Sequence, residues 1–162
     1  MKTLYILRHA KASSNMEDYA DIDRPLKPSG IADAYALGEA LKKRKAEISA
    51  IAVSDACRAL QTATIVAREA HIAGYAIAIH PELYLPDDDS VTMDIIRATP
   101  DSVSSLMVVG HNPNLSMLCG ELLPSFAEEL PTCGLVAIEV SASRWLDVNP
   151  DNAKYLYNIF PK

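Results

Sequence analysis

The chain opens with the stretch Leu4-Tyr5-Ile6-Leu7-Arg8-His9, from which the rest of the sequence can be interpreted. Four consecutive apolar residues are typical of a short strand buried on both faces, as strands of a parallel sheet are. The pair Arg8-His9 follows directly, so a guanidinium and an imidazole are expected at the carboxyl end of this strand. In open α/β sheets that end of the strands is where ligands bind.

Two further apolar runs place charged or polar side chains in the same kind of position. Residues 106–110 are followed by His111, and residues 51–54 lead into Arg58. Each of these side chains stands where a strand pattern changes to a helix pattern. Because the carboxyl ends of parallel strands meet at one edge of a sheet, we expect them to lie near Arg8-His9.

Strand patterns alternate with amphipathic helix patterns along most of the chain. The expected strands are residues 4–7, 48–54, 75–80, 106–110, 135–140 and 155–159, and the expected helices are residues 29–44, 58–70, 91–98 and 114–123. This alternation predicts an α/β fold: a three-layer sandwich with a mainly parallel central sheet flanked by helices. The last two strands are joined by a turn-rich link, which predicts an antiparallel pair at a sheet edge.

Size and charge limit the possible functions. The chain has 162 residues, 49% of them hydrophobic, which suits one domain covering residues 1–162. Fifteen Lys and Arg against 21 Asp and Glu give a net charge of -6. A nucleic-acid partner would favour a basic surface, and polyanionic substrates are also disfavoured. An acidic protein can still bind phosphate if its few cations are concentrated in one pocket.

Cysteine usage and the absence of long apolar runs indicate a location. The three cysteines, Cys57, Cys119 and Cys133, are odd in number and far apart, which favours a reducing compartment. The apolar run before Arg8 is too short for a signal-peptide core, and no run reaches the ~20 apolar residues that a membrane helix needs. We therefore expect a cytoplasmic protein with no membrane partner.

The residues at the strand ends suit phosphoryl transfer. A neutral His9 could attack phosphorus and form a phosphohistidine that water then hydrolyses. Arg8 and Arg58 could clamp the equatorial oxygens, with His111 as a further donor. Helix starts at Arg58 and after Asn112 would add backbone amides, which makes Asn112 a candidate phosphate-binding residue. This chemistry calls for no metal and no cofactor.

The order of these motifs resembles a known family. Four stretches carry the resemblance: Leu7-Arg8-His9-Ala10-Lys11-Ala12-Ser13, Asp23-Arg24-Pro25-Leu26, Arg58-Ala59-Leu60-Gln61-Thr62-Ala63 and Val109-Gly110-His111-Asn112-Pro113. They are similar to the histidine phosphatase superfamily, in particular to its small phosphohistidine phosphatases of the SixA type. The resemblance spans nearly the whole chain. It implies a phosphoglycerate mutase-like fold, a nucleophilic His9, a phosphate pocket of Arg8, Arg58 and His111, no metal, and dephosphorylation of phosphohistidine on a protein.

The sequence departs from the family pattern at two places. Ala10 stands where the superfamily commonly has glycine, a substitution shared by the branch that carries Lys11. Ser54-Asp55 stands where Ser-Pro is expected before the arginine. At that place Asp55 is expected to cap the following helix by accepting amide hydrogen bonds.

Whether the site has a general acid bears on its substrate. An alkoxide leaving group needs a proton donor, whereas an imidazole leaving from phosphohistidine protonates near neutrality. Glu82 lies where the wider superfamily often carries its acid, so it is a candidate general acid; a solvent-facing loop carboxylate is the alternative. The run Asp87-Asp88-Asp89 superficially resembles a metal site, but without nearby histidines it is better interpreted as a solvated turn.

Other functions compete with this interpretation. The same pocket would suit a phosphatase of small phosphate monoesters, or a non-catalytic module that binds phosphorylated proteins. A cysteine-based phosphatase is excluded, because an arginine would have to follow a cysteine by six positions, where Ala63, Ser125 and Glu139 stand instead. Metal-dependent hydrolysis is poorly supported, since no two histidines have ligand spacing.

The small size of the chain also bears on the substrate. Few residues remain for a lid over the strand ends, so the site is expected to be open enough to admit a side chain of another protein. A small metabolite would favour more enclosure. Lys11, Arg24 and Lys27 could line the approach to such a site, although each is more often a surface charge.

Overall fold

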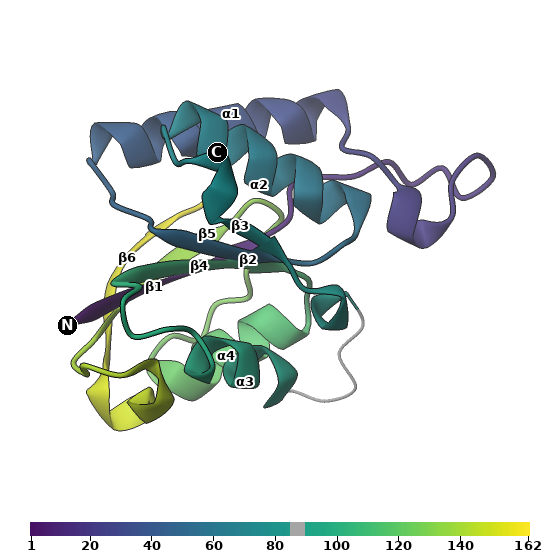
Figure 1. Ribbon diagram of the computed structural model, residues 1–162. Helices are drawn as coiled ribbons and strands as arrows, with labels where there is room; N and C mark the ends of the chain where they lie inside the picture. Colours follow the sequence, from purple (N-terminus) through teal and green to yellow (C-terminus); the bar gives the residue numbers. More distant parts are fainter. Residues whose placement is uncertain (85–89) are drawn as a thin grey trace.

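The computed structural model describes residues 1–84 and 90–162, so the predicted turn at Asp87-Asp88-Asp89 lies outside the described residues. Six strands form one sheet in the order β3-β2-β4-β1-β5-β6 (Figure 1). The strands are β1 Lys2–Arg8, β2 Ala50–Val53, β3 Ile77–Ile79, β4 Ser105–Gly110, β5 Leu135–Val140 and β6 Ala153–Ile159. Every predicted strand is present; β5 has the predicted bounds, and the ends of the others differ from the prediction by at most two residues.

Four α-helices and several short 3₁₀ helices accompany the sheet. The α-helices are α1 Pro28–Lys43, α2 Cys57–Glu69, α3 Ser90–Arg97 and α4 Asn114–Leu122. The short helices are η1 Asp21–Asp23, η2 Gly74–Ala76, η3 Pro81–Leu83, η4 Trp145–Asp147 and η5 Pro150–Asn152. Figure 1 shows α1 and α2 over one face of the sheet and α3 and α4 over the other. The predicted three-layer α/β sandwich is therefore confirmed.

Strand pairing aligns the carboxyl ends of three strands. β1 runs parallel to β4 with Arg8 opposite Gly110, and β2 runs parallel to β4 with Val53 opposite Val109. β5 is antiparallel to both β1 and β6, so the predicted antiparallel pair at the sheet edge is also confirmed. The polar residues that follow β1, β2 and β4 consequently emerge at one edge of the sheet.

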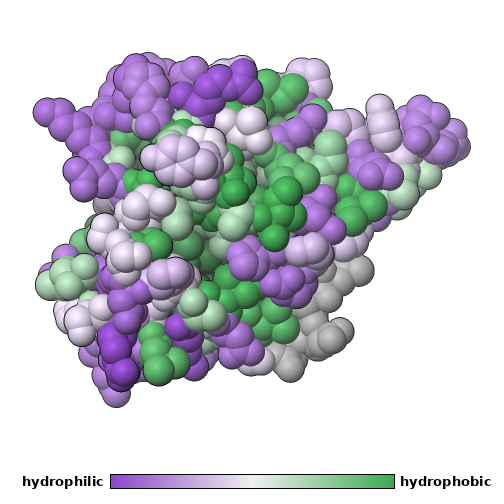
Figure 2. Space-filling model, viewed as in Figure 1, coloured by the Kyte–Doolittle hydropathy of each residue, from purple (hydrophilic) through white to green (hydrophobic). Residues whose placement is uncertain are grey.

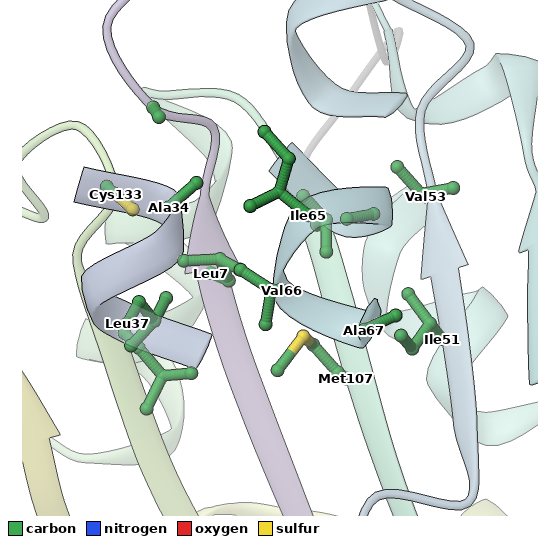
Figure 3. Packing of buried hydrophobic residues seen from close by; sticks show 14 of the residues in the cluster. Leu7, Ala34, Leu37, Ile51, Val53, Ile65, Val66, Ala67, Met107 and Cys133 are labelled. Atoms are coloured by element: carbon green, nitrogen blue, oxygen red, sulfur yellow. The ribbon is translucent and has the colours of Figure 1, made fainter. Parts of the chain in front are cut away.

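The alternation of side chains along β1 divides the hydrophobic core into two clusters. Tyr5 and Leu7 belong to the cluster beneath α1 and α2, where Leu7 lies near Leu37 and Val66 (Figure 3). Leu4 and Ile6, on the other face, belong to the cluster under α3 and α4. Burying one such side chain contributes about 1.5–3 kcal/mol. A strand buried on both faces is therefore held firmly, and so is the end that it presents.

The hydropathy of the molecular surface varies from one layer of the sandwich to the next. Figure 2 shows hydrophilic residues over the α1 layer and at the tip of the projecting loop, and hydrophobic residues gathered between the two helical layers. Within the described parts of the chain, no helix combines the length and the apolar character needed to cross a membrane. Trp145 is fully buried in the second cluster and donates from its indole Nε1 to the Val103 carbonyl at 2.7 Å.

Gly30 in α1 fixes the chain that follows β1, and its replacement gives a testable prediction. A Cβ added at Gly30 would lie 2.1 Å from the Lys11 carbonyl oxygen, a backbone atom that cannot turn away. We expect Gly30→Ala to destabilise the fold by about 1–3 kcal/mol, as overpacking does. By thermal unfolding the midpoint should fall by about 2–10 °C.

Gly120 in α4 offers a matched control, because no atom lies within 4 Å of its added Cβ. Alanine is favoured over glycine by up to about 1 kcal/mol inside a helix, so Gly120→Ala should leave the midpoint unchanged or raise it. Equal midpoints for the two variants would contradict the close packing of Gly30 against Lys11.

Candidate functional site

The segment after β1 is held by hydrogen bonds from several elements. The His9 amide extends the ladder with β4 by donating to the Gly110 carbonyl at 3.1 Å. The next amide, of Ala10, donates to Thr62 Oγ1 at 3.0 Å, and this hydroxyl donates to the Arg58 carbonyl at 2.7 Å. The first turn of α2 is thereby tied to the backbone beside His9.

A pocket of about 370 Å³ opens at this end of the sheet. Its described lining residues are Arg8, His9, Lys11, Ala12, Arg24, Lys27, Arg58, His111, Asn112 and Thr132. The structure thus brings the predicted residues Arg8, His9, Arg58, His111 and Asn112 into one pocket. It adds Lys11, Arg24 and Lys27, the residues expected along the approach.

The His9 ring has a defined proton position. Its Nδ1 lies 2.8 Å from the Ala10 carbonyl oxygen, which can only accept, so Nδ1 carries the proton. In the neutral ring Nε2 then keeps its lone pair. Burial, together with the nearby cations Arg58, Arg8 and Arg24, lowers the pKa of His9 to about 4, against the raising effect of the Ala10 carbonyl. At neutral pH the ring is therefore uncharged, with Nδ1 protonated and Nε2 unprotonated.

His111 lies beside His9, with 5.1 Å between the ring centroids. Burial lowers its pKa to about 3, assisted by His9 and Arg58. Its Nε2 is 2.9 Å from Ser54 Oγ, which also accepts the Ala56 amide. A Ser54 hydroxyl that donates to Nε2 leaves the His111 proton on Nδ1, a buried atom without a partner among the described residues.

Arg58 is almost fully buried and is oriented by Asp21 in η1. Its NH1 donates to the Asp21 carbonyl at 2.7 Å, and its NH2 lies 3.2 Å from Asp21 Oδ2. The Tyr84 hydroxyl donates to the same carboxylate oxygen, and Arg24 Nε donates to Oδ1 at 3.0 Å. The Tyr84 hydrogen bond, followed by Arg58 and Arg24, lowers the pKa of Asp21 well below its usual value. Asp21 therefore stays charged and holds two arginines in place.

Arg8 is fixed from the other side of the pocket by the Leu130 carbonyl. Arg8 NH1 and Asn112 Nδ2 each donate to this oxygen at 3.0 Å. Asn112 Oδ1 accepts from both the amide and the hydroxyl of Ser116. The Asn112 side chain, which lines the pocket, thus links the segment at Leu130 to Ser116 in α4.

Asp55 does not cap α2 as predicted. The helix begins at Cys57 with Ala56 at the cap position, and no side chain caps it. Asp55 Oδ1 is buried without a hydrogen-bond partner among the described residues, and Ser54 Oγ accepts the Ala56 amide instead. Ser54 therefore supports both the turn before Arg58 and the ring of His111.

Glu82 lies outside the lining of the His9 pocket. It belongs to η3, its side chain is 51% exposed, and its Oε1 lies 2.9 Å from His80 Nδ1. Its pKa is lowered, first by its own backbone amide and then by His80. Both residues line a different, mainly apolar cavity of about 520 Å³ between β2, β3 and α3. Its role as general acid remains a prediction.

Several residues that orient the pocket side chains were not predicted from the sequence. Pocket side chains are oriented by Asp21, Tyr84, Ser54, Thr62 and the Leu130 carbonyl.

In residues 1–84 and 90–162 no group of three or more His, Cys, Asp or Glu side chains could hold a metal ion.

The lowered pKa of His9 predicts a neutral ring under mildly acidic conditions. In the free protein its ring resonances should stay in the neutral form from about pH 7 to 5 and titrate near the value of about 4 given by burial. Histidine-selective NMR of the wild type, assigned with His9→Ala, measures this. Because burial and the arginines cause the shift, inorganic phosphate in the pocket should move the titration upward. A midpoint near 6.5 in the free protein would contradict a buried ring beside cations.

Comparison with known proteins places the chain in a family. The family model of the histidine phosphatase superfamily (branch 1) matches residues 4–84. The Mycobacterium tuberculosis protein Rv1276c is 32% identical over 154 residues, covering 89% of this chain and 92% of that protein. Phosphohistidine phosphatase SixA of Escherichia coli is 29% identical over 135 residues, covering 83% and 82%.

Solved structures agree on the fold. A Nakamurella multipartitia protein provisionally assigned as SixA superposes with a TM-score of 0.85 at 24% identity, covering 99% of this chain and 96% of that one. The family match includes β1, which ends at Arg8 next to His9, and α2, which begins at Cys57 and carries Arg58. The chain belongs to the histidine phosphatase superfamily (branch 1), and its fold is that of the SixA proteins.

Proposed function

We propose that this protein hydrolyses phosphohistidine on a protein substrate, through a covalent phosphohistidine on His9 and without a metal ion. The main support is the state of His9. Its neutral, buried ring holds the Nδ1 proton against the Ala10 carbonyl, its Nε2 has no hydrogen-bond partner among the described residues, and three arginines line the same pocket. A nucleophile of this kind has no use in a module that only binds phosphate.

The reaction follows in two displacements. The Nε2 lone pair of His9 attacks phosphorus, the bond between phosphorus and the substrate imidazole breaks, and its electron pair goes to the leaving nitrogen, which takes a proton from water. A water molecule then attacks the phosphoryl group on His9. The bond to Nε2 breaks, phosphate leaves, and the ring recovers its lone pair. Two moderate barriers replace one high barrier.

Unpaired donors in the pocket support the role of the cations. Among the described residues, Arg8 Nε, Arg58 Nε and His111 Nδ1 are buried without hydrogen-bond partners. A buried donor without a partner costs about 1–3 kcal/mol. Phosphoryl oxygens would supply the missing acceptors, and the charge of the transition state would spread onto donors already in position.

The lack of a carboxylate in the described pocket lining favours an imidazole leaving group. No carboxylate is found among the described residues that line the pocket, and the candidate Glu82 is exposed and paired with His80. An alkoxide leaving group needs a proton donor close by, whereas an imidazole with a pKa near 6.5 needs little help. Hydrolysis of small phosphate monoesters is the alternative, with the same pocket.

Phosphate release from three substrates tests the proposal: a phosphohistidine-bearing protein domain, free phosphohistidine and an aryl phosphate, each with and without a chelator. We expect kcat/KM to be highest for a phosphohistidine substrate and unaffected by the chelator. Release from the aryl phosphate alone would move the substrate to small esters. Oxyanion binding with no release from any of the three would favour a binding module.

Glu82→Gln separates the two kinds of leaving group. If Glu82 protonates a leaving oxygen, the variant should lower kcat/KM for the aryl phosphate by about 10²-fold and change phosphohistidine hydrolysis little. His80→Gln, which removes only the partner of Glu82, is the control. Equal losses on both substrates would contradict a role for Glu82 that depends on the leaving group.

A further inference from the structure

The pocket concentrates positive charge in an acidic protein. Five of its described lining residues are Lys or Arg, out of 15 in a chain of net charge -6. The four acidic residues of the neighbouring loop, Glu17, Asp18, Asp21 and Asp23, are not among the described lining residues. Like charges held together repel each other, so such a cluster favours an anionic ligand.

A count of charges shows that one phosphoryl group does not match this cluster. Arg8, Arg24, Arg58, Lys11 and Lys27 contribute five positive charges. Among the described residues, Asp21 is the carboxylate that forms ion pairs with them, to Arg24 and Arg58, and it offsets one charge; Glu129 acts on Arg8 without an ion pair and is left out of this count. A phosphoryl group brings about -1.5 to -2, which offsets about two more. An excess of about two positive charges remains, the number carried by Lys11 and Lys27.

Lys11 and Lys27 stand on a rigid base. The Lys27 amide donates to the Lys11 carbonyl at 2.9 Å, and a β-bridge joins the adjacent residues Ala12 and Leu26. The Leu26 amide donates to Gln61 Oε1 at 2.7 Å, which ties this pair of segments to α2. Both lysines are exposed. Their backbone is thus held at the mouth of the pocket, and their exposed side chains can reach a ligand there.

The surface beside the two lysines suits a protein better than a small molecule. The loop between them projects from the sandwich (Figure 1) and exposes Met16 at 59% and Tyr19 at 39%. Its shape is held by Arg24, whose NH1 donates to the Ser13 carbonyl at 2.7 Å. A protein that binds beside the two lysines would cover these apolar and aromatic side chains, which a small molecule in the pocket would leave exposed.

We propose that Lys11 and Lys27 form a recognition rim for a protein whose phosphohistidine is flanked by acidic side chains. This inference rests on the proposed function and deepens it by naming the chemistry of the partner surface. Asp or Glu side chains near the phosphorylated residue would meet the two ammonium groups as the phosphoryl group enters between Arg8 and Arg58. The rim would thus select among phosphoproteins that present the same phosphoryl group.

Two phosphohistidine peptides test the rim, one with glutamates flanking the phosphohistidine and one with glutamines at the same positions. For the wild type we expect kcat/KM to be about fivefold to tenfold higher for the glutamate peptide at low ionic strength. The preference should shrink near physiological salt, where the Debye length is about 8 Å. In Lys11→Glu/Lys27→Glu the ratio should fall to one or below.

Lys42→Glu/Lys154→Glu is the matched control, because it makes the same change in net charge at exposed lysines outside the pocket lining. It should keep the wild-type ratio. A wild-type ratio of one, or an unchanged ratio in the rim variant, would overturn the rim. Higher kcat/KM for a small ester with a second phosphate than for the glutamate peptide would overturn the protein partner.

Binding of the two peptides to His9→Ala gives the same comparison without turnover. Preferential binding of the glutamate peptide there, without hydrolysis by the wild type, would refute the proposed activity and uphold the rim. Hydrolysis of both peptides with no difference in affinity would refute the rim and uphold the activity.

Discussion

Replacing His9 with alanine is expected to lower turnover of phosphohistidine by about 10³-fold or more while leaving oxyanion binding in place. In the proposed reaction the His9 imidazole forms the bond between the protein and phosphorus, and a methyl group cannot substitute for it. The groups proposed to bind the phosphoryl oxygens, Arg8, Arg58 and His111, keep the partners that hold them, which are Leu130, Asp21 and Ser54. Phosphate release and equilibrium binding of tungstate measure the two properties separately.

The control for this change is His71→Asn. His71 is exposed at the end of α2 and has a φ of 60°, a conformation that asparagine tolerates well. The His71→Asn variant should retain full phosphatase activity. In addition, intact-protein mass spectrometry should detect a phosphorylated intermediate in the wild type and none in His9→Ala. Turnover near the wild-type rate in His9→Ala would show that His9 does not form the covalent intermediate.

The sequence was sufficient to place the pocket because its residues follow strands that are easy to identify. Leu4 to Leu7 and Leu106 to Val109 are continuous apolar runs, as expected for strands of a parallel sheet that are buried on both faces, and the two strands pair in the structure. Once β1, β2 and β4 are adjacent, the side chains that follow them must meet. The prediction therefore depended on local pattern and on one rule of sheet topology.

The order of the strands could not be read from local pattern, and it determines where Glu82 lies. β3 is at the edge of the sheet, three strand spacings from β1. At about 4.8 Å per spacing, the end of β3 is roughly 14 Å from the strand that carries His9. Glu82 follows β3, so its distance from the nucleophile depends on how the chain returns toward the pocket. A sequence pattern carries no information on that path.

Asp21 and Tyr84 were missed for a different reason. Asp21 is one of 21 acidic residues, and Tyr84 one of seven tyrosines, with no periodicity to mark either. Their importance arises only when folding brings a loop, a 3₁₀ helix and α2 together around Arg58. The prediction that Asp55 caps α2 was wrong because of a small shift in where the helix begins. The helix starts one residue too late for Asp55 to be its cap, and Ser54 accepts the amide that precedes it.

Replacing Arg58 with alanine is expected to lower kcat/KM by about 10³-fold and, unlike His9→Ala, to weaken oxyanion binding as well. The buried guanidinium of Arg58 is oriented by Asp21. Its Nε has no hydrogen-bond partner among the described residues, so it can donate to an incoming phosphoryl oxygen. Arg58→Lys keeps the charge but loses the planar fork. It should recover binding in part and kcat less, because orientation matters most in the transition state.

Arg68→Ala provides the matched control, since Arg68 is an exposed arginine of the same helix outside the pocket lining. It should leave both activity and oxyanion binding unchanged. Asp21 keeps Tyr84 and Arg24 as partners when Arg58 is removed, so the variant is expected to fold, and thermal unfolding checks this. If kcat/KM in Arg58→Ala fell only in proportion to the folded fraction, Arg58 would serve the fold alone. If kcat fell while tungstate bound as tightly as in the wild type, Arg58 would act only in the transition state and the phosphate clamp would rest on Arg8.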